Sequence, residues 1–292
     1  MVCGNGLVGQ GLVEFGFGKL QPNVDKLFGR TIDYAPNQRN LVRKDLLDNN
    51  FAVVVNAAGP SNVLESLSLP DQYLDFPWRQ CATHLSILGE LPNPPVYVFI
   101  SSGSVYGDTG LEGASELTSL NPISPYAEGK LKAELFLQEA SRSYRGGIVV
   151  LRCFSIYSDN LKSRIPFVIA TKMAKNNSFT LSGTGFELRD FVHVKDVARA
   201  IGVVGALQAE FLTFNVGTGI GISIEEVCQI AANAFGIEYI QNQTVVFNGD
   251  VRKSDPQNLV ADISKIQNLG FSASISPHEG LLRYFQLKKQ IL

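Results

Sequence analysis

Charge of one sign is not in excess in this chain of 292 residues, where 25 Lys and Arg residues face 27 Asp and Glu residues and leave a formal net charge of −2. No basic or acidic block interrupts that balance, so the sequence offers no electrostatic footprint for a polyanion or a membrane surface. Nucleic acid and membranes are therefore not expected as partners. Hydrophobic residues make up 45% of the chain and charged residues only 18%, which is typical of a compact globular protein.

Cysteine is scarce, and its spacing carries no metal or disulfide pattern. Cys3, Cys81, Cys153 and Cys228 lie far apart and form no CxxC or mixed His and Cys spacing, so we expect neither a metal site nor a disulfide framework. The longest apolar run, 200–207, contains glycines and falls well short of the roughly 18 residues that a membrane span needs. The opening letters MVCGNGLVGQ lack the positive head and apolar middle of a secretory signal. We therefore expect a protein of the reducing cytoplasm.

Short apolar runs alternate with segments of helical periodicity, which is the order that a parallel sheet with crossover helices requires. The chain is predicted to fold as an α/β protein with a Rossmann-like, doubly wound parallel sheet. The expected strands are 42–44, 52–56, 96–101, 147–152 and 211–216. The expected helices are 9–15, 75–89, 126–143 and 195–207.

The alternation loosens from about residue 155 into longer connections that contain Pro166, Gly183 and Gly249. This loosening indicates a second, smaller lobe built from insertions after the later strands. We expect the sheet domain over 1–154 and 190–219 and the smaller lobe over 155–189 and 220–292. Ligands of open α/β sheets bind at the carboxyl ends of the strands, so the site is expected in a cleft between the lobes.

A glycine-rich segment near the start fits the GxGxxG pattern, in which glycines permit a tight turn and a helix N-terminus holds a pyrophosphate. An ordinary glycine-rich turn would fit the same letters, and only residues 1–3 remain for the strand before it. The candidate cofactor-binding residues of this segment are Gly4, Asn5, Gly6, Leu7, Val8 and Gly9.

No Asp or Glu closes a second strand to bind the ribose hydroxyls of NAD. Arg30, which follows Leu27-Phe28-Gly29, stands there instead, and an arginine at that position can pair with the 2′-phosphate of NADP. A solvated surface arginine is an equally good interpretation of Arg30. The expected cofactor is therefore NAD or NADP.

Tyr126 and Lys130 carry the stronger chemical signal. Four residues apart on a helix, they share one face, so the ammonium can favour the ionised form of a phenol whose ordinary pKa is about 10. Ser102, at the end of an expected strand, could then bind the substrate oxygen that gains or loses the proton. Spacing alone favours a plain surface pair, so this interpretation needs the support of further motifs.

That support comes from eight segments that occur in a fixed order. Taken together, they resemble the extended short-chain dehydrogenase/reductase family, specifically its NAD(P)-dependent nucleotide-sugar epimerases, dehydratases and reductases. The segments are GNGLVG, VVVNAAGPS, FISSGSVYGD, SPYAEGK, LRCFSIYSD, LSGTGFELRDFVHVKDVARAI, FNVGTG and VADISKIQNLGF.

The resemblance implies roles for individual residues. Tyr126 matches the catalytic base, Lys130 the lysine that lowers its pKa and holds the nicotinamide ribose, and Ser102 the catalytic Ser or Thr. The residues implied to line the cofactor elsewhere are Asp45, Leu46, Ala57, Ala58 and Gly59.

On the substrate side, Arg189 and Arg252 match the arginines that hold the diphosphate of a sugar nucleotide, a dianion suited to two guanidiniums. An ion pair of Arg189 with Asp190 is the structural alternative. Phe154 and Ser155 match an aromatic and an Asn near the substrate, and Ser155 is a departure from that pattern.

Three further positions bear on the resemblance. Arg79 departs from the pattern, because it falls where the family has an Asn that supports the catalytic Tyr and Lys. Cys3 replaces the first glycine of the family's usual motif. His193 is expected to be a packed residue at a helix start.

The resemblance also indicates which reactions to leave aside. Dehydratases of the family carry an Asp-Glu pair where this chain has Gly103 and Ser104, so dehydration is not expected. The fucose-synthase branch carries a Cys at the position of Ser104, so 3,5-epimerisation is not expected either. We therefore expect a nucleotide-sugar epimerase acting at C4 through a transient 4-keto sugar, with Tyr126 as acid and base. The alternatives are an NADP-dependent 4-keto-sugar reductase and a catalytically silent NAD(P)-binding protein. The expected partners are a nucleotide-diphosphate sugar and a second copy of the chain, paired partly through the helix at 126–143.

Overall fold

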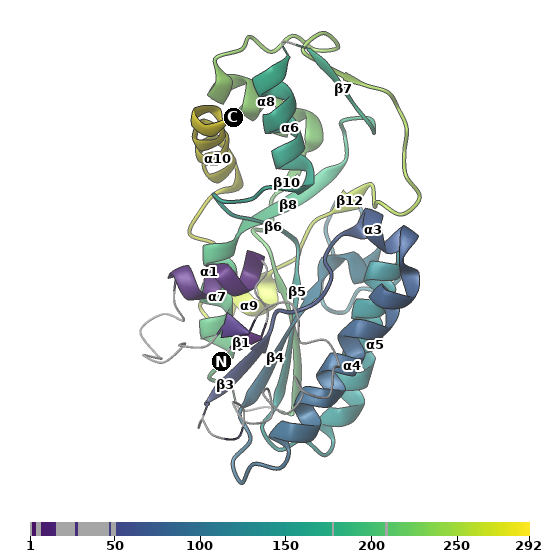
Figure 1. Cartoon of the computed structure of the whole chain (residues 1–292), viewed down its shortest axis with the longest axis vertical. Coiled ribbons are helices and arrows are strands. Elements are labelled where there is room, and N and C mark those ends of the chain that lie inside the picture. The colour runs from purple at the N-terminus through teal and green to yellow at the C-terminus, as the bar shows by residue number, and fades with distance from the viewer. Residues whose placement is uncertain are drawn as a thin grey trace.

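A computed structural model describes residues 2–3, 7–15, 27–28, 47, 51–176, 178–207 and 210–292. These residues form a larger part built on a parallel sheet and a smaller part that carries the C-terminal helix (Figure 1). Within them, no helix is both long enough and apolar enough to cross a membrane.

The larger sheet has six parallel strands in the order β2-β1-β3-β4-β5-β9. They are β1 (Val2–Cys3), β2 (Leu27–Phe28), β3 (Val53–Asn56), β4 (Val96–Ser102), β5 (Ile148–Cys153) and β9 (Phe211–Val216). The doubly wound sheet is confirmed, and the last four of these strands lie within one residue of their predicted bounds. The predicted strand at 42–44 lies outside the described residues. The chain order reverses between β1 and β3, which makes this the switch point of the sheet.

Helices cover both faces of this sheet. On one face lie α1 (Leu7–Phe15) and α7 (Val194–Val204), which pack with Val98 and Ile100 of β4. On the other face lie α3 (Val63–Ser68), α4 (Pro70–Leu88) and α5 (Pro125–Ser141), and Tyr97 and Phe99 of β4 belong to that core. Because both faces are buried, the strands read as continuous apolar runs rather than alternating ones. All four predicted helices are present, although α4 begins five residues before the predicted start.

The helices α4 and α5 lie side by side and approach each other closely at Gly129 (Figure 1). A side-chain carbon built on Gly129 would lie 2.8 Å from the carbonyl carbon of Tyr73. Farther along the pair, Lys132 Nζ lies 2.8 Å from Asp75 Oδ1. The glycine of the YAEGK segment therefore allows the backbones of the two helices to meet.

The smaller part is built around β8 (Leu188–His193). It pairs with β6 (Ser155–Tyr157) and β12 (Asn258–Leu259) in parallel and with β10 (Gly221–Ser223) antiparallel. A second core joins it to the neighbouring helices and strand pair. These are α6 (Arg164–Lys175), α8 (Ile224–Phe235), α10 (Pro277–Ile291), β7 (Phe179–Leu181) and β11 (Val245–Phe247).

The segment after β12 returns to the larger sheet. Ala261, Ile266 and Phe271 pack in the core of that sheet, and α9 (Ser264–Gln267) lies beside β9. The sequence assigned these residues to the smaller lobe over 220–292. The domain boundaries remain a prediction, and this segment is the part of that range that contacts the other core.

Candidate active site

The switch point between β1 and β3 is lined by small residues. The backbone N–H of Ala57 donates to the Cys3 carbonyl at 2.8 Å, which places 57–59 beside the end of β1. Gly59 has φ of 122°, a backbone conformation that favours glycine. Leu7, Val8 and Gly9 form the first turn of α1, and the N–H groups in the first turn of a helix suit a phosphate.

The residues present at this crevice fit a dinucleotide, because small side chains and a helix start leave its backbone approachable. The other residues that the sequence assigned to the cofactor lie outside the described part of the chain. They are Gly4, Asn5, Gly6, Arg30, Asp45 and Leu46.

The helix α5 begins with a Ser-Pro pair, a sequence signal for a helix start. Ser124 Oγ accepts a hydrogen bond from the Ala127 N–H at 3.3 Å, which places Tyr126 in the first turn. The Tyr126 ring is half-buried and lies edge-on to Tyr73, with ring centroids 6.4 Å apart. Tyr126 therefore stands at the end of α5 that is nearest the carboxyl ends of the strands.

Lys130 reaches the carboxyl end of β4. Its side chain is only 7% exposed, and Nζ donates to the Ile100 carbonyl at 2.8 Å. Ile100 stands two residues before Ser102, the last residue of β4. The predicted trio thus comes from one helix and one strand end, with Tyr126 and Lys130 one helical turn apart.

Ser102 begins the 3₁₀ turn η2 (Gly103–Tyr106). Its Oγ accepts hydrogen bonds from the Ser104 N–H at 3.2 Å and from the Ser104 hydroxyl at 2.9 Å. A hydroxyl has two acceptor positions and one donor. With both acceptor positions used, the Ser102 hydroxyl has its own hydrogen available for a substrate oxygen.

Phe154 packs beneath this turn. Its ring is 4% exposed and stacks on Tyr106 at 6.3 Å between centroids. A side-chain carbon on Gly103 would lie 2.9 Å from the Phe154 ring. Phe154 therefore supports the serine turn, and its contact with substrate remains a prediction, as does that of half-buried Ser155 in β6.

Arg189 is held in the smaller part by a loop distant in sequence. Its Nη2 donates to Asp255 Oδ1 at 2.8 Å, and its Nη1 donates to the Gln257 carbonyl at 3.2 Å. Exposed Arg252 lies three residues before Asp255, so the two predicted arginines belong to adjoining segments. The alternative ion pair of Arg189 with Asp190 is wrong. Asp190 instead accepts hydrogen bonds from Thr218 and Gly219.

Arg79 and His193 lie apart from this chemistry. The Arg79 side chain is half-exposed and forms an ion pair at 2.9 Å with Asp75, four residues earlier on α4. His193 is buried and caps α7, with Nδ1 accepting from the Lys195 N–H at 3.2 Å. The position of His193 agrees with the predicted packed helix-start residue.

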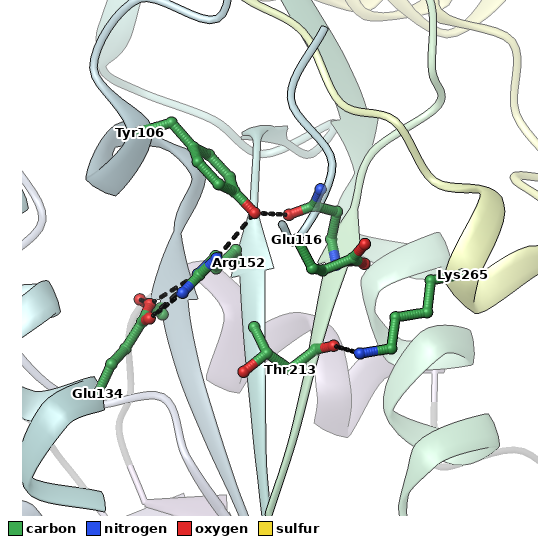
Figure 2. A network of polar contacts seen from close by, with 8 residues as sticks. Tyr106, Glu116, Glu134, Arg152, Thr213 and Lys265 are labelled. Carbon is green, nitrogen blue, oxygen red and sulfur yellow. Dashed lines mark hydrogen bonds and ion pairs between the residues drawn. The ribbon is translucent and has the colours of Figure 1, made fainter. Parts of the chain in front are cut away.

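Sequence reasoning missed a buried polar network beside the serine turn, which Figure 2 shows. Arg152 Nη2 lies 2.7 Å from Glu134 Oε2, and Arg152 Nη1 donates to the Tyr106 hydroxyl at 2.9 Å. Tyr106 donates in turn to Asn215 Oδ1 at 2.7 Å. Burial raises the pKa of the Tyr106 phenol, so it remains protonated and able to donate. The available sequence signal was Arg152 itself, a charge at the end of an apolar run.

A second set of contacts joins the chain after this turn to the segment around β12. The Thr109 N–H donates to the Asn258 carbonyl at 3.0 Å, and the Val260 N–H donates to Thr109 Oγ1 at 2.9 Å. Ala114 then donates its N–H to the Val260 carbonyl at 3.0 Å. We refer to these contacts between 109–114 and 258–260 as the clasp.

The four cysteines are buried, and burial raises the pKa of each thiol to about 12. Among the described residues, no group of three or more His, Cys, Asp or Glu side chains is arranged to hold a metal ion.

Comparison with known proteins agrees with this arrangement. The sequence model of the NAD dependent epimerase/dehydratase family matches residues 18–217. The chain belongs to this family. The UDP-glucose 4-epimerase of Mycoplasma genitalium is 28% identical, over 91% of this chain and 88% of that protein. The UDP-glucose 4-epimerase of Dictyostelium discoideum is also 28% identical, over 86% and 79%.

Two solved structures share the fold. MoeE5 in complex with UDP-glucose and NAD superposes with a TM-score of 0.82 at 24% identity, covering 99% of this chain and 98% of its own. RMD from Pseudomonas aeruginosa, complexed with NADPH, superposes with a TM-score of 0.83 at 20% identity, covering 100% and 99%. The family is NAD-dependent, in agreement with the nicotinamide dinucleotide expected from the sequence.

Proposed function

We propose that the protein is a nucleotide-sugar epimerase that inverts C4 through a transient 4-keto sugar. The observation that carries the proposal is the reach of Lys130 from α5 to the Ile100 carbonyl, two residues before Ser102. This contact draws the Tyr126 and Lys130 helix and the serine turn to one strand end. Relatives named UDP-glucose 4-epimerases, matched over most of both chains, support a uridine diphosphate sugar as the first substrate to test.

In this reaction, Tyr126 removes the proton of the C4 hydroxyl and later returns it. The Lys130 ammonium lies one helical turn away on the helix that carries this phenol, so its positive charge belongs to the same site. The Ser102 hydroxyl donates to the same substrate oxygen, so the oxygen keeps a partner in both the alcohol and the ketone. A nicotinamide dinucleotide supplies a hydride acceptor that can give the hydride back.

The cofactor would lie along the switch point, with its pyrophosphate at the start of α1 and its chain past 57–59. The diphosphate of the substrate would bind Arg252 and Arg189, and the Arg189 guanidinium would then bind both the diphosphate and Asp255. We keep both NAD and NADP as candidates, because the residue expected to discriminate them, Arg30, is not among the described residues.

We further propose a homodimer paired partly through α5. Leu135 lies on this helix with its side chain 57% exposed, an apolar position suited to a second copy. Light scattering of the purified protein should give twice the mass of the chain, and a monomer would contradict this part of the proposal.

The proposal is tested by incubating the purified protein with UDP-glucose or UDP-galactose without added dinucleotide. Interconversion of the two sugars and retained NAD in the mass spectrum support the epimerase. Conversion of a 4-keto sugar only with added NADPH would assign the reductase alternative instead.

The Tyr126→Phe variant should lower kcat by about 10²- to 10⁴-fold, the usual contribution of a positioned acid or base. Tyr144→Phe is the matched control, because that buried phenol donates to the Pro95 carbonyl at the opposite end of the sheet. If wild type converts no nucleotide sugar and Tyr126→Phe is indistinguishable from it, the enzyme interpretation fails and the silent binding protein remains.

A further inference from the structure

Arg152 and Glu134 form an ion pair in the interior of the larger, sheet-containing part. The side chains of Arg152 and Glu134 are only 8% and 5% exposed. Removing two charges from water is costly, and well-packed apolar residues often stabilise a core as well or better. Stability alone therefore does not explain why a buried ion pair occupies this position.

The pair joins four elements at the carboxyl end of the sheet, and Figure 2 shows its contacts with Tyr106. Glu134 belongs to α5 and accepts from Arg152 Nε at 3.0 Å and from Nη2 at 2.7 Å. Ser101 of β4 also donates its hydroxyl to Glu134. Arg152 of β5 uses its remaining nitrogen, Nη1, for the Tyr106 hydroxyl at the end of η2.

These elements carry the proposed catalytic residues. Glu134 follows Lys130 by one turn of α5, as Lys130 follows Tyr126, and Ser101 directly precedes Ser102. Tyr106 ends the short turn that begins at Ser102. The guanidinium of Arg152 thus contacts both the helix of the phenol and the turn of the serine.

A planar guanidinium with several donors fixes direction as well as distance, which an ammonium cannot do. The far side of the turn is anchored as well, because Tyr106 donates to Asn215 of β9, and Asn215 Nδ2 donates to the Ala114 carbonyl at 2.7 Å. The serine turn is therefore held between α5 on one side and β9 on the other.

We propose that Glu134, Arg152 and Tyr106 are positioning residues that keep the Ser102 hydroxyl in register with Tyr126 and Lys130. The inference rests on the proposed function, since it assigns these residues to the reaction at that site. A misplacement of about 1 Å in a reacting group can lower a rate about 100-fold, so a modest shift of the turn would be visible in kcat.

Tyr106→Phe is the decisive variant. It removes one hydroxyl, leaves the ring free to stack on Phe154, and leaves the ion pair of Arg152 and Glu134 in place. We expect kcat to fall about 10- to 100-fold with the KM for the nucleotide sugar changed less than about threefold. Arg152→Lys keeps the charge but cannot hold both partners, and it should show the same separation of kcat from KM.

Tyr144→Phe again supplies the matched control. Its phenol is also buried and its hydroxyl also donates inside the protein, at 2.6 Å to the Pro95 carbonyl, but that bond is remote from the serine turn. A comparable change in the urea midpoint with unchanged kcat is expected. If Tyr106→Phe and Tyr144→Phe have equal kcat, or if only KM rises in Tyr106→Phe, the positioning role is overturned.

Hydrogen exchange gives a readout that does not depend on turnover. The amides of 103–107 should exchange faster in Tyr106→Phe than in wild type, and not in Tyr144→Phe. If wild type itself converts no nucleotide sugar, the proposed function fails, and exchange in this turn then decides only whether the Tyr106 hydroxyl holds the turn. Unchanged exchange in Tyr106→Phe would overturn the positioning role.

Discussion

Replacing Gly129 by alanine should destabilise the protein, although alanine is the better helix former. A methyl group at this position would lie 2.8 Å from the Tyr73 carbonyl carbon and 3.2 Å from Leu74 Cα, and closer still to the Tyr73 carbonyl oxygen. All three atoms belong to the backbone of α4, so no side chain can rotate away. The helices α4 and α5 would have to separate.

The magnitude follows from two opposing effects. Glycine to alanine within a helix gains about 1 kcal/mol of helix propensity. Overpacking a close contact typically costs about 1–3 kcal/mol and more where backbone must move. The atoms that the methyl group meets are backbone, which puts the cost near the upper end of that range, so we expect a net loss of about 1–2 kcal/mol in the free energy of unfolding. We also expect a fall in kcat, because α5 carries the proposed catalytic residues Tyr126 and Lys130.

Gly202→Ala is the matched control for this prediction. Gly202 lies inside α7, and a side-chain carbon there would meet no atom within 4 Å. That variant should gain about 0.5–1 kcal/mol from propensity alone. Urea unfolding of both variants measures the difference. If Gly129→Ala proves as stable as Gly202→Ala, the close approach of the two helices is wrong.

Three further predictions concern buried polar groups. Burial lowers the pKa of His84 from 6.5 to about 4. Because the unfolded chain therefore takes up the proton at a higher pH than the folded protein does, the free energy of unfolding should fall as the pH drops from 6.5 towards 4, by up to about 1.4 kcal/mol per pH unit. Urea unfolding of His84→Gln should show a shallower dependence of the free energy of unfolding on pH. Ser104→Ala should lower kcat about fivefold to tenfold, because it removes one donor to the Ser102 hydroxyl. Ser104→Thr keeps a hydroxyl and should restore kcat. Unchanged kinetics in the alanine variant would disprove the hydrogen bond. The four buried thiols should resist a thiol reagent in the native protein and react after denaturation, so rapid native labelling would contradict their burial.

The long central strands were predictable because their pattern is local. The strand β9 was expected at 211–216 and occurs there, and β4 and β5 differ from expectation by one residue. Helices cover both faces of the sheet, so a short apolar run bounded by turn residues was a sufficient signal. The spacing of Tyr126 and Lys130 likewise fixed their relation, since one helix carries both.

Contacts that join distant segments could not be read in the same way. The strand β12 has two residues and exists only because β8, 70 residues earlier, offers it an edge. The partner of Arg189 is Asp255 rather than its neighbour Asp190, a choice made by the path of a loop. The network of Arg152 depends on three other elements, and periodicity reports on one element at a time.

The clasp has a consequence for the construction of hybrid enzymes within this family. Residues 109–114 come soon after the serine turn, whereas 258–260 follow the loop of Arg252. In a chimera that exchanges only the C-terminal third, residues 109–114 would come from one parent and their hydrogen-bond partners at 258–260 from the other. Swapping sugar preference between relatives should therefore succeed more often when both stretches are transplanted together from the same parent.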